Sequence, residues 1–177
     1  MTRTLKLSGQ VIALSAVAGL LALLGWRVTH QVHAPKVGAP APVFTLRRLS
    51  GLGSVDLAVL RGHTVVLNFW ASWCIPCKQE ATVLQRAWNR YRGKGVVFVG
   101  IDFHDAISDG RRFVAAHQLR FAMVEDGSGD ITTGRYGVSQ VPETYVVDGH
   151  GKVALHIVGP IAGGAVTREF QHALAGA

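Results

Sequence analysis

The feature that most restricts the fold of this chain is an almost continuous apolar segment followed closely by two cysteines. Residues Thr64–Trp70 read TVVLNFW, a run of β-branched and aromatic residues typical of a strand buried on both faces of a sheet. The only two cysteines of the chain, Cys74 and Cys77, come shortly afterwards. Pro76 is typical of a first helical turn, and apolar residues then recur at helical spacing as far as Tyr91. The pattern predicts a strand, a cysteine pair and a helix, with Cys74 at the helix N-terminus.

The rest of the chain alternates between strand and helix patterns. The expected strands cover Gly95–Asp102, residues 120–126 and the two arms of a hairpin at Glu143–Gly159. The expected helices cover Ser108–Arg120, a short stretch at 129–138 and the C-terminal residues 164–177. This order predicts an α/β fold with a mixed central sheet and helices on both of its faces. We interpret Asp102 as a turn or capping residue and His104 as an exposed residue.

The N-terminus has the pattern of a membrane anchor. Two basic residues precede an uncharged run of 20 residues, Leu7–Trp26, which as a helix spans the roughly 30 Å of a bilayer's hydrocarbon core. A cleaved signal peptide is the alternative, but the candidate cleavage sites are followed by Pro35 and Pro40. We therefore predict a single-pass anchor in the cytoplasmic (inner) membrane with its N-terminus inside. Residues 1–36 form this anchor and a linker, and residues 37–177 form a folded domain on the periplasmic side.

The formal net charge of +7 does not indicate nucleic-acid binding, because of where the charges lie. Residues 1–36 hold four of the basic residues and no acidic one, which leaves 14 basic and 11 acidic residues in the remainder. That remainder has a net charge of only +3 and no basic run interleaved with aromatic residues. The sequence therefore predicts no nucleic-acid partner.

Four roles are conceivable for Cys74 and Cys77. A structural disulfide across so short a loop would remove little entropy from the unfolded chain. A zinc site would need four ligands, and the chain has no second cysteine pair. Covalent haem attachment would need a histidine directly after Cys77, where Lys78 stands. A redox couple fits best, because the helix N-terminus stabilises a Cys74 thiolate and the shielded Cys77 can resolve a mixed disulfide. No cofactor or metal is expected.

Two longer motifs resemble one known group of proteins. The stretches VVLNFWASWCIPCKQE and YGVSQVPETYVVDGHGKV are similar to the thioredoxin superfamily and, within it, to the membrane-anchored TlpA/ResA/CcmG (DsbE) group. The resemblance covers residues 37–177 and implies a thioredoxin-like fold with an added N-terminal β-hairpin at Pro42–Gly62. It also implies a cis proline, Pro142, which leaves the Val141 backbone free to pair with a substrate strand beside the disulfide. Trp73, directly before the first cysteine, is expected to shape the rim of this substrate-binding site.

The resemblance also points to two acidic residues. Thioredoxins of the cytoplasmic type carry a buried acid at the position of Asn68, which cannot take up a proton at neutral pH. Another acid must then assist Cys77. Glu80 lies one helical turn beyond Cys77, Glu143 follows Pro142, and both positions match acids of the TlpA-like group. We expect both to tune the thiol pKa and to transfer protons. The PET motif favours the CcmG branch and WASWCIPCKQE favours the ResA branch, so the branch stays open.

These features predict a thiol–disulfide oxidoreductase that acts outside the cytoplasm. The group that the chain resembles implies reduction of specific partners, such as apocytochrome c in cytochrome c maturation, with electrons from a membrane reductase. An oxidant that forms disulfides in exported proteins is an alternative within the class. A peroxidase is another, although it would need a threonine where Ala71 stands. A non-catalytic thioredoxin-like binding module is the alternative of a different class, and it gives no reason for Cys74, Cys77 and Pro142 to occur together.

Overall fold

The computed structural model describes residues 14–26 and 33–175. The chain divides into two compact units, residues 1–32 and 33–177, and each is treated by itself. In the first unit, residues 14–26 form a helix. Across the described residues, no helix has both the length and the apolar character needed to cross a membrane. Residues 7–13, the first part of the predicted anchor, lie outside the described residues.

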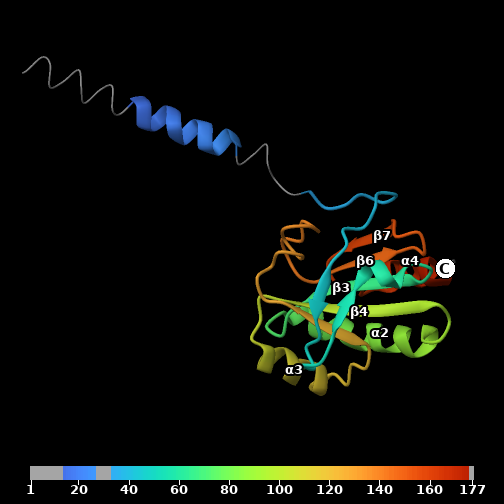
Figure 1. The fold of residues 1–177 in the computed structure, drawn as a ribbon. Coiled ribbons are helices and arrows are strands. Elements are labelled where there is room, and N and C mark those ends of the chain that lie inside the picture. The colour runs from blue at the N-terminus through green and yellow to red at the C-terminus, as the bar shows by residue number, and fades with distance from the viewer. Residues whose placement is uncertain (1–13, 27–32, 176–177) are drawn as a thin grey trace, which may run out of the picture. The chain divides into compact units, whose positions relative to one another are not determined.

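The second unit is built around a five-stranded sheet, shown in Figure 1. The strands lie in the order β5 (Ala122–Asp126), β4 (Val96–Phe103), β3 (Thr64–Trp70), β6 (Glu143–Val147) and β7 (Val153–Val158). The central strand β3 runs parallel to β4 and antiparallel to β6, so the sheet is mixed, as predicted. All seven residues of β3 are buried, because this strand is covered on both faces.

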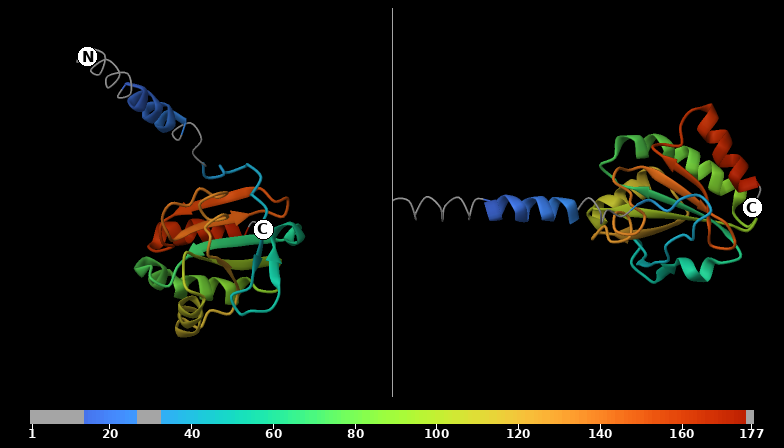
Figure 2. Two further views of the ribbon diagram at one scale, coloured as in Figure 1. Left: turned by 60° about the vertical axis from the view of Figure 1, so that its left-hand side comes forward. Right: turned by 90° about the horizontal axis from the view of Figure 1, so that it is seen from above.

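Between residues 33 and 175, the α-helices are α2 (Ile75–Tyr91), α3 (Ile107–Ala116) and α4 (Gly164–Ala175). The buried side chains of all three join one apolar cluster with Val66 and Trp70 of β3, so they cover the same face of the sheet. Figure 2 (right) shows α2 and α4 on one side of the sheet and the short 3-10 helix η1 (Leu57–Leu60) on the other. The sequence predicted helices on both faces of the sheet. Among the described residues, the face opposite the α-helices carries only the short 3-10 helix η1, so the prediction is met only in part.

The order of the strands explains this arrangement. The connections β3–α2–β4 and β4–α3–β5 step across the sheet in the same direction. Two right-handed crossovers that step the same way place both of their helices on one face. The spacing of apolar residues along the chain does not contain the strand order, so this outcome could not be predicted from it.

The opposite face is covered by the N-terminal hairpin and by the loop before β6. β1 (Thr45–Arg47) and β2 (Ser54–Asp56) pair in an antiparallel manner, which confirms the hairpin expected within Pro42–Gly62. Apolar side chains of this region form a second buried cluster with the other face of β3. The sheet therefore separates two apolar clusters, one on each of its faces.

The prediction of a short helix at 129–138 is wrong, because this segment consists of consecutive turns. The Asp126 carboxylate accepts hydrogen bonds from the amide and the hydroxyl of Thr132, at 2.7 and 2.6 Å. Such side-chain bonds compete with those of a helix. Tyr136 is fully buried and its hydroxyl donates to the Pro42 carbonyl at 2.9 Å, so the segment closes this face of the sheet.

Candidate active site

Cys74 and Cys77 lie at the C-terminal edge of the parallel strands. β3 ends at Trp70, and Cys74 is the N-cap residue of α2. The two cysteines form a disulfide bond, and their Cα atoms are 5.3 Å apart. The Cys77 amide donates a hydrogen bond to Cys74 Sγ at 3.1 Å, so an amide of the first helical turn points at this sulfur. In the reduced form, that amide and the positive end of the helix dipole would stabilise a thiolate at Cys74.

The disulfide is covered, but the residues on either side of Cys74 are not. Only 3% of Cys74 and 2% of Cys77 are exposed. Exposure therefore does not distinguish the two sulfurs, whereas the amide contact does. Trp73 and Ile75 are 58% and 67% exposed, so the surface beside Cys74 is apolar and accessible.

The Val141–Pro142 peptide bond is cis, which confirms the conformation expected for Pro142. The Val141 carbonyl oxygen lies 3.5 Å from Cys74 Sγ, so this loop and the cysteine pair meet although they are distant in sequence. Within the part of the chain that the structure describes, the Val141 amide donates no hydrogen bond. The backbone here offers an unused donor beside the disulfide, of the kind that pairs with an extended peptide.

Glu80, one turn beyond Cys77 in α2, is buried and only 1% exposed. Each oxygen of its carboxyl group accepts one hydrogen bond. Oε1 accepts from the Asn68 side-chain amide at 2.7 Å, and Oε2 accepts from the Ile161 backbone amide at 2.8 Å. Burial raises the pKa of Glu80 from 4.5 to about 7, and the two hydrogen bonds oppose that rise. A group with such a pKa can take up and release a proton at neutral pH.

Glu143 is also buried, but its side chain lies on the opposite face of the sheet from Glu80. It pairs in register with Phe69, which belongs to the apolar cluster on the face away from the α-helices. Its Oε2 atom lies 2.7 Å from Nε2 of His156, an ion pair when the histidine is protonated. Proton transfer by Glu143 at the cysteines stays a prediction. No sequence pattern indicates His156 as the partner of Glu143, because the register of the β6–β7 hairpin decides that pairing.

Asp102 lies inside β4 and is 2% exposed, so its interpretation as a turn or capping residue is wrong. The strand continues to Phe103, and Asp102 pairs in register with Trp70 at the end of β3. Burial, together with the negative charge of Asp105, raises the pKa of Asp102 to about 8. His104 is exposed, as predicted. A single aspartate at the end of an apolar run carries no sequence signal that it will be buried.

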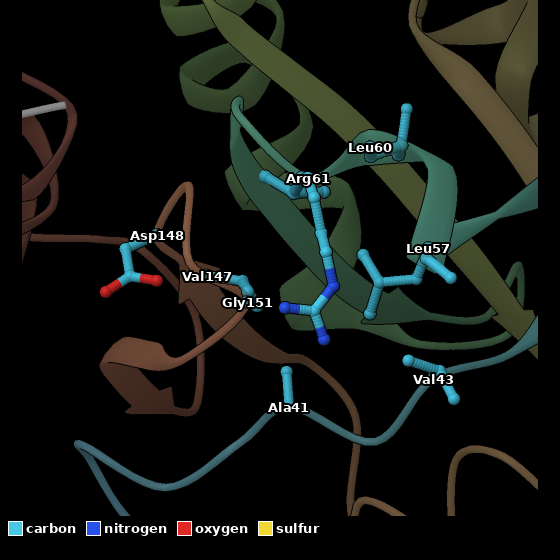
Figure 3. A pocket seen from close by; sticks show the side chains of 10 residues that line it. Ala41, Val43, Leu57, Leu60, Arg61, Val147, Asp148 and Gly151 are labelled. Atoms are coloured by element: carbon cyan, nitrogen blue, oxygen red, sulfur yellow. The ribbon is translucent and has the colours of Figure 1, made fainter.

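A hollow of about 380 Å³ lies beside the cysteine pair and is lined by residues that include Ser72, Lys78 and Phe113. Within residues 14–26 and 33–175, no group of three or more histidine, cysteine, aspartate or glutamate side chains could hold a metal ion. A cavity of about 10 Å³ lies at the N-terminal end of β3, where Figure 3 shows the Arg61 side chain reaching toward Ala41. Arg61 donates to the His150 carbonyl at 3.0 Å and so supports the hairpin turn. A cavity of this size holds at most one water molecule.

Comparison with known proteins gives a consistent result. Residues 37–156 match the model of the AhpC/TSA family. The thiol-disulfide oxidoreductase ResA of Bacillus thuringiensis (strain Al Hakam) is 33% identical over 124 residues, which are 70% of each chain. ResA of Geobacillus thermodenitrificans (strain NG80-2) is 33% identical over 144 residues, which are 79% of this chain and 82% of that one.

Solved structures are similar over most of the chain as well. A candidate thiol:disulfide interchange protein DsbE from Chlorobium tepidum has 30% identity and a TM-score of 0.73, with 81% of this chain and 98% of that chain covered. A secreted Mycobacterium tuberculosis disulfide oxidoreductase homologous to E. coli DsbE has 30% identity and a TM-score of 0.66, with 76% and 96% covered. These similarities confirm the predicted thioredoxin-like α/β fold.

Proposed function

Since this chain belongs to the AhpC/TSA family and is a thiol–disulfide oxidoreductase of the ResA and DsbE type, we propose that it reduces disulfides in specific exported proteins. The substrate class that we favour is apocytochrome c, whose CxxCH thiols must be reduced before haem is attached. The observation that carries the proposal is the buried Glu80, one helical turn from Cys77.

Glu80 favours a reductant through its charge. A carboxylate beside a thiol disfavours a second negative charge and so raises the pKa of the thiol. Strong oxidants of this chemistry owe their potential to an unusually stabilised reduced form. Glu80 works against such stabilisation, so the reduced pair gives up its electrons more readily. The helix N-terminus acts in the opposite sense, but about 0.3–1 kcal/mol at an exposed end corresponds to roughly 20 mV at most.

The redox step can be written with these residues. The Cys74 thiolate attacks one sulfur of the partner's disulfide, the partner's S–S bond breaks, and its other sulfur leaves as a thiolate that takes up a proton. Cys77 then passes its proton to Glu80 and attacks Cys74 Sγ. The Cys74–Cys77 bond forms, the mixed disulfide breaks, and the partner leaves with both of its cysteines reduced. Two electrons pass to the partner, and we propose that a membrane reductase returns them to the pair.

The surface around the pair supports a protein substrate. The amide of Val141, which has no hydrogen-bond partner among the described residues, lies next to Pro142 and can pair with an extended segment of the partner. The exposed side chains of Trp73 and Ile75 provide apolar contact beside Cys74. A peroxidase is not favoured, because Ala71 is fully buried and offers no hydroxyl group where a threonine would be needed.

We further propose that residues 1–36 are an uncleaved anchor and linker in the cytoplasmic membrane, and that residues 37–177 are the catalytic domain on its periplasmic side. The uncharged run Leu7–Trp26 supports an anchor, because 20 residues suffice to span a bilayer as a helix. A tether of this kind would keep the dithiol close to a membrane electron donor.

The reduction potential of the full-length protein tests the proposed direction. The protein is equilibrated with glutathione or dithiothreitol buffers, and the fluorescence of Trp70 and Trp73 reports the state of the disulfide. We expect a potential closer to that of thioredoxin, about −270 mV, than to that of DsbA, about −120 mV. A value near that of DsbA, with rapid oxidation of a reduced test protein, would move the function to disulfide formation.

A second assay tests the substrate class. An oxidised peptide with the sequence CxxCH is compared with the same peptide carrying alanine in place of histidine. We expect the reduced protein to reduce the CxxCH peptide faster, because a dedicated maturation factor recognises residues around the substrate cysteines. Equal rates would argue for a general disulfide reductase.

A further inference from the structure

Asp102 is a buried acid that the proposed redox step does not use. It lies near the C-terminal end of β4, beside Trp70, and among the described residues its Oδ1 atom has no hydrogen-bond partner. Its Oδ2 atom lies so close to Gly110 of α3 that a Cβ atom at that position would be 2.0 Å away. Any side chain at position 110 would displace the carboxyl group, and glycine leaves it the space that it needs.

The loop after β4 supports the segment that carries Cys74. Asp105 Oδ2 accepts a hydrogen bond of 2.6 Å from the Ser72 amide, and Asp105 Oδ1 accepts one of 2.8 Å from the next amide of its own loop. The indole of Trp73 donates to the carbonyl of His104 in the same loop at 3.4 Å. Ser72 and Trp73 directly precede Cys74, so this loop fixes the approach of the chain to the disulfide.

A hydrogen bond between carboxyl groups joins Asp102 to Asp105. Such a bond requires that one of the two groups carries a proton, because two carboxylates offer only acceptors. Both oxygens of Asp105 already accept hydrogen bonds from backbone amides, that of Ser72 and the next amide of the loop. Burial stabilises the neutral form of Asp102, whose pKa is raised to about 8. Asp102 therefore carries a proton at neutral pH and donates the hydrogen bond that Asp105 accepts.

The other charged neighbours of Asp102 are acidic as well. Asp109 of α3 and Glu125 of β5 both disfavour a negative charge on it, as Asp105 does from the loop. Their counter-ions, Arg112 and Arg47, form exposed ion pairs with them. β3 contributes only the uncharged Trp70.

We propose that Asp102, in its protonated form, is a positioning residue for the dithiol, which holds Asp105 and through it the segment from Ser72 to Cys74. This inference rests on the proposed function, because it concerns the reactivity of the same cysteine pair. With the proton in place, Asp105 is held against the Ser72 amide. When Asp102 ionises, the two carboxylates repel each other, the segment loses its support, and reaction at the disulfide slows.

The test uses the full-length oxidised protein, in which the two cysteines do not titrate. The rate at which dithiothreitol reduces the Cys74–Cys77 disulfide is measured from about pH 6 to about pH 10. Wild type is compared with Asp102→Asn and Asp105→Ala, and with Asp130→Asn as a matched control at an exposed aspartate. Each rate is divided by the wild-type rate at the same pH, because the ionisation of dithiothreitol affects both rates equally and cancels in the ratio.

The variant Asp102→Asn keeps a donor for Asp105 and cannot ionise. We expect its rate to match wild type near neutral pH and to exceed it on the order of tenfold at about pH 10, less than the roughly 100-fold that a 1 Å misplacement can cost. Asp105→Ala should lower the rate at every pH, and Asp130→Asn should follow wild type. The proposal would be overturned if Asp102→Asn were reduced at the same rate as wild type at every pH. It would also be overturned if Asp105→Ala were reduced at the wild-type rate.

If Asp102→Asn does not fold, a second measurement decides. In the oxidised Glu80→Gln protein, which lacks the titration of Glu80, the fluorescence of Trp70 and Trp73 should change with a midpoint near the pKa of Asp102, about 8. The absence of that transition would overturn the proposal. An oxidising reduction potential would instead overturn the proposed function and leave the rate ratios as they are, so the two failures are distinguishable.

Discussion

The Asn68 side-chain amide donates a hydrogen bond of 2.7 Å to Glu80 Oε1 and so links the central strand β3 to α2. The same amide donates to Thr144 Oγ1 at 3.0 Å, which fixes its orientation. Asn68 cannot carry a proton itself, but it holds a residue that can. The titratable group therefore lies on the helix, one turn beyond Cys77, instead of on the strand.

Glu80→Gln should lower the apparent pKa of the dithiol by about one unit, because it removes a negative charge that disfavours the thiolate. The measurement is the rate of alkylation of reduced Cys74 and Cys77 against pH, and the two thiols are treated as one titrating pair. Glu169→Gln, at an exposed position of α4, is the control. Unchanged alkylation in Glu80→Gln would make Glu143 the better candidate for this role.

Asn68→Ala should act in the opposite direction. Its hydrogen bond favours the ionised form of Glu80, so its loss raises the pKa of Glu80 above about 7. The pH dependence of disulfide exchange then shifts upward, because a higher pH is needed before Glu80 can accept the proton of Cys77. A profile identical to that of wild type would show that the hydrogen bond does not tune this acid.

Cys77→Ser should accumulate a mixed disulfide with partner proteins, and Cys74→Ser should not. The reason is the amide of Cys77, which points at Cys74 Sγ and makes that sulfur the stabilised thiolate. Non-reducing electrophoresis of the two variants after exposure to an oxidised substrate gives the answer. Preferential alkylation of Cys77 in the reduced wild type at neutral pH would reverse the assignment.

The free energy of unfolding should fall as the pH rises. The pKa of Glu80 is raised from 4.5 to about 7 and that of Asp102 from 3.8 to about 8, so the folded protein binds protons that the unfolded chain has released. Their contribution is complete below about pH 4 and is lost as the pH passes through the folded values. For Glu80 the change is on the order of 3 kcal/mol.

Urea denaturation of the oxidised protein at several pH values measures this dependence. Glu80→Gln should flatten the curve around neutral pH, and Asp102→Asn should flatten it at more alkaline pH. Unfolding free energies that rise between mildly acidic and alkaline solution would contradict the assignment of raised pKa values to these two carboxyl groups.

His156→Leu should destabilise the fold by about 1–3 kcal/mol, because it leaves the buried Glu143 without its partner. The matched control is His150→Leu, since His150 lies exposed in the hairpin turn. Adding Glu143→Gln to His156→Leu should recover part of the loss, because no buried charge then stays unpaired. Equal destabilisation by the two leucine variants would mean that the Glu143–His156 pair does not contribute.

The sequence around the cysteines determined the part of the site that lies on β3 and α2. One short chain segment holds the buried strand, the N-cap cysteine, the second cysteine one turn later and the acid one further turn on. Because these features are close in sequence, strand and helical periodicity determine their relative positions. Cys74, Cys77 and Glu80 stand where that periodicity puts them, and the resemblance correctly implied the cis bond at Pro142 and the N-terminal hairpin.

Only the tertiary structure decided what meets across the sheet. The strand order placed α2, α3 and α4 on one face, and the hairpin register turned Glu143 toward His156 and away from Glu80. Packing of α3 buried Asp102, which the sequence presents as an ordinary turn residue. Periodicity along the chain fixes which residues share a face of one element, whereas register and burial depend on contacts between residues far apart in sequence. Burial raises the pKa of Glu80 and that of Asp102, so these shifts could be recognised only from the tertiary structure.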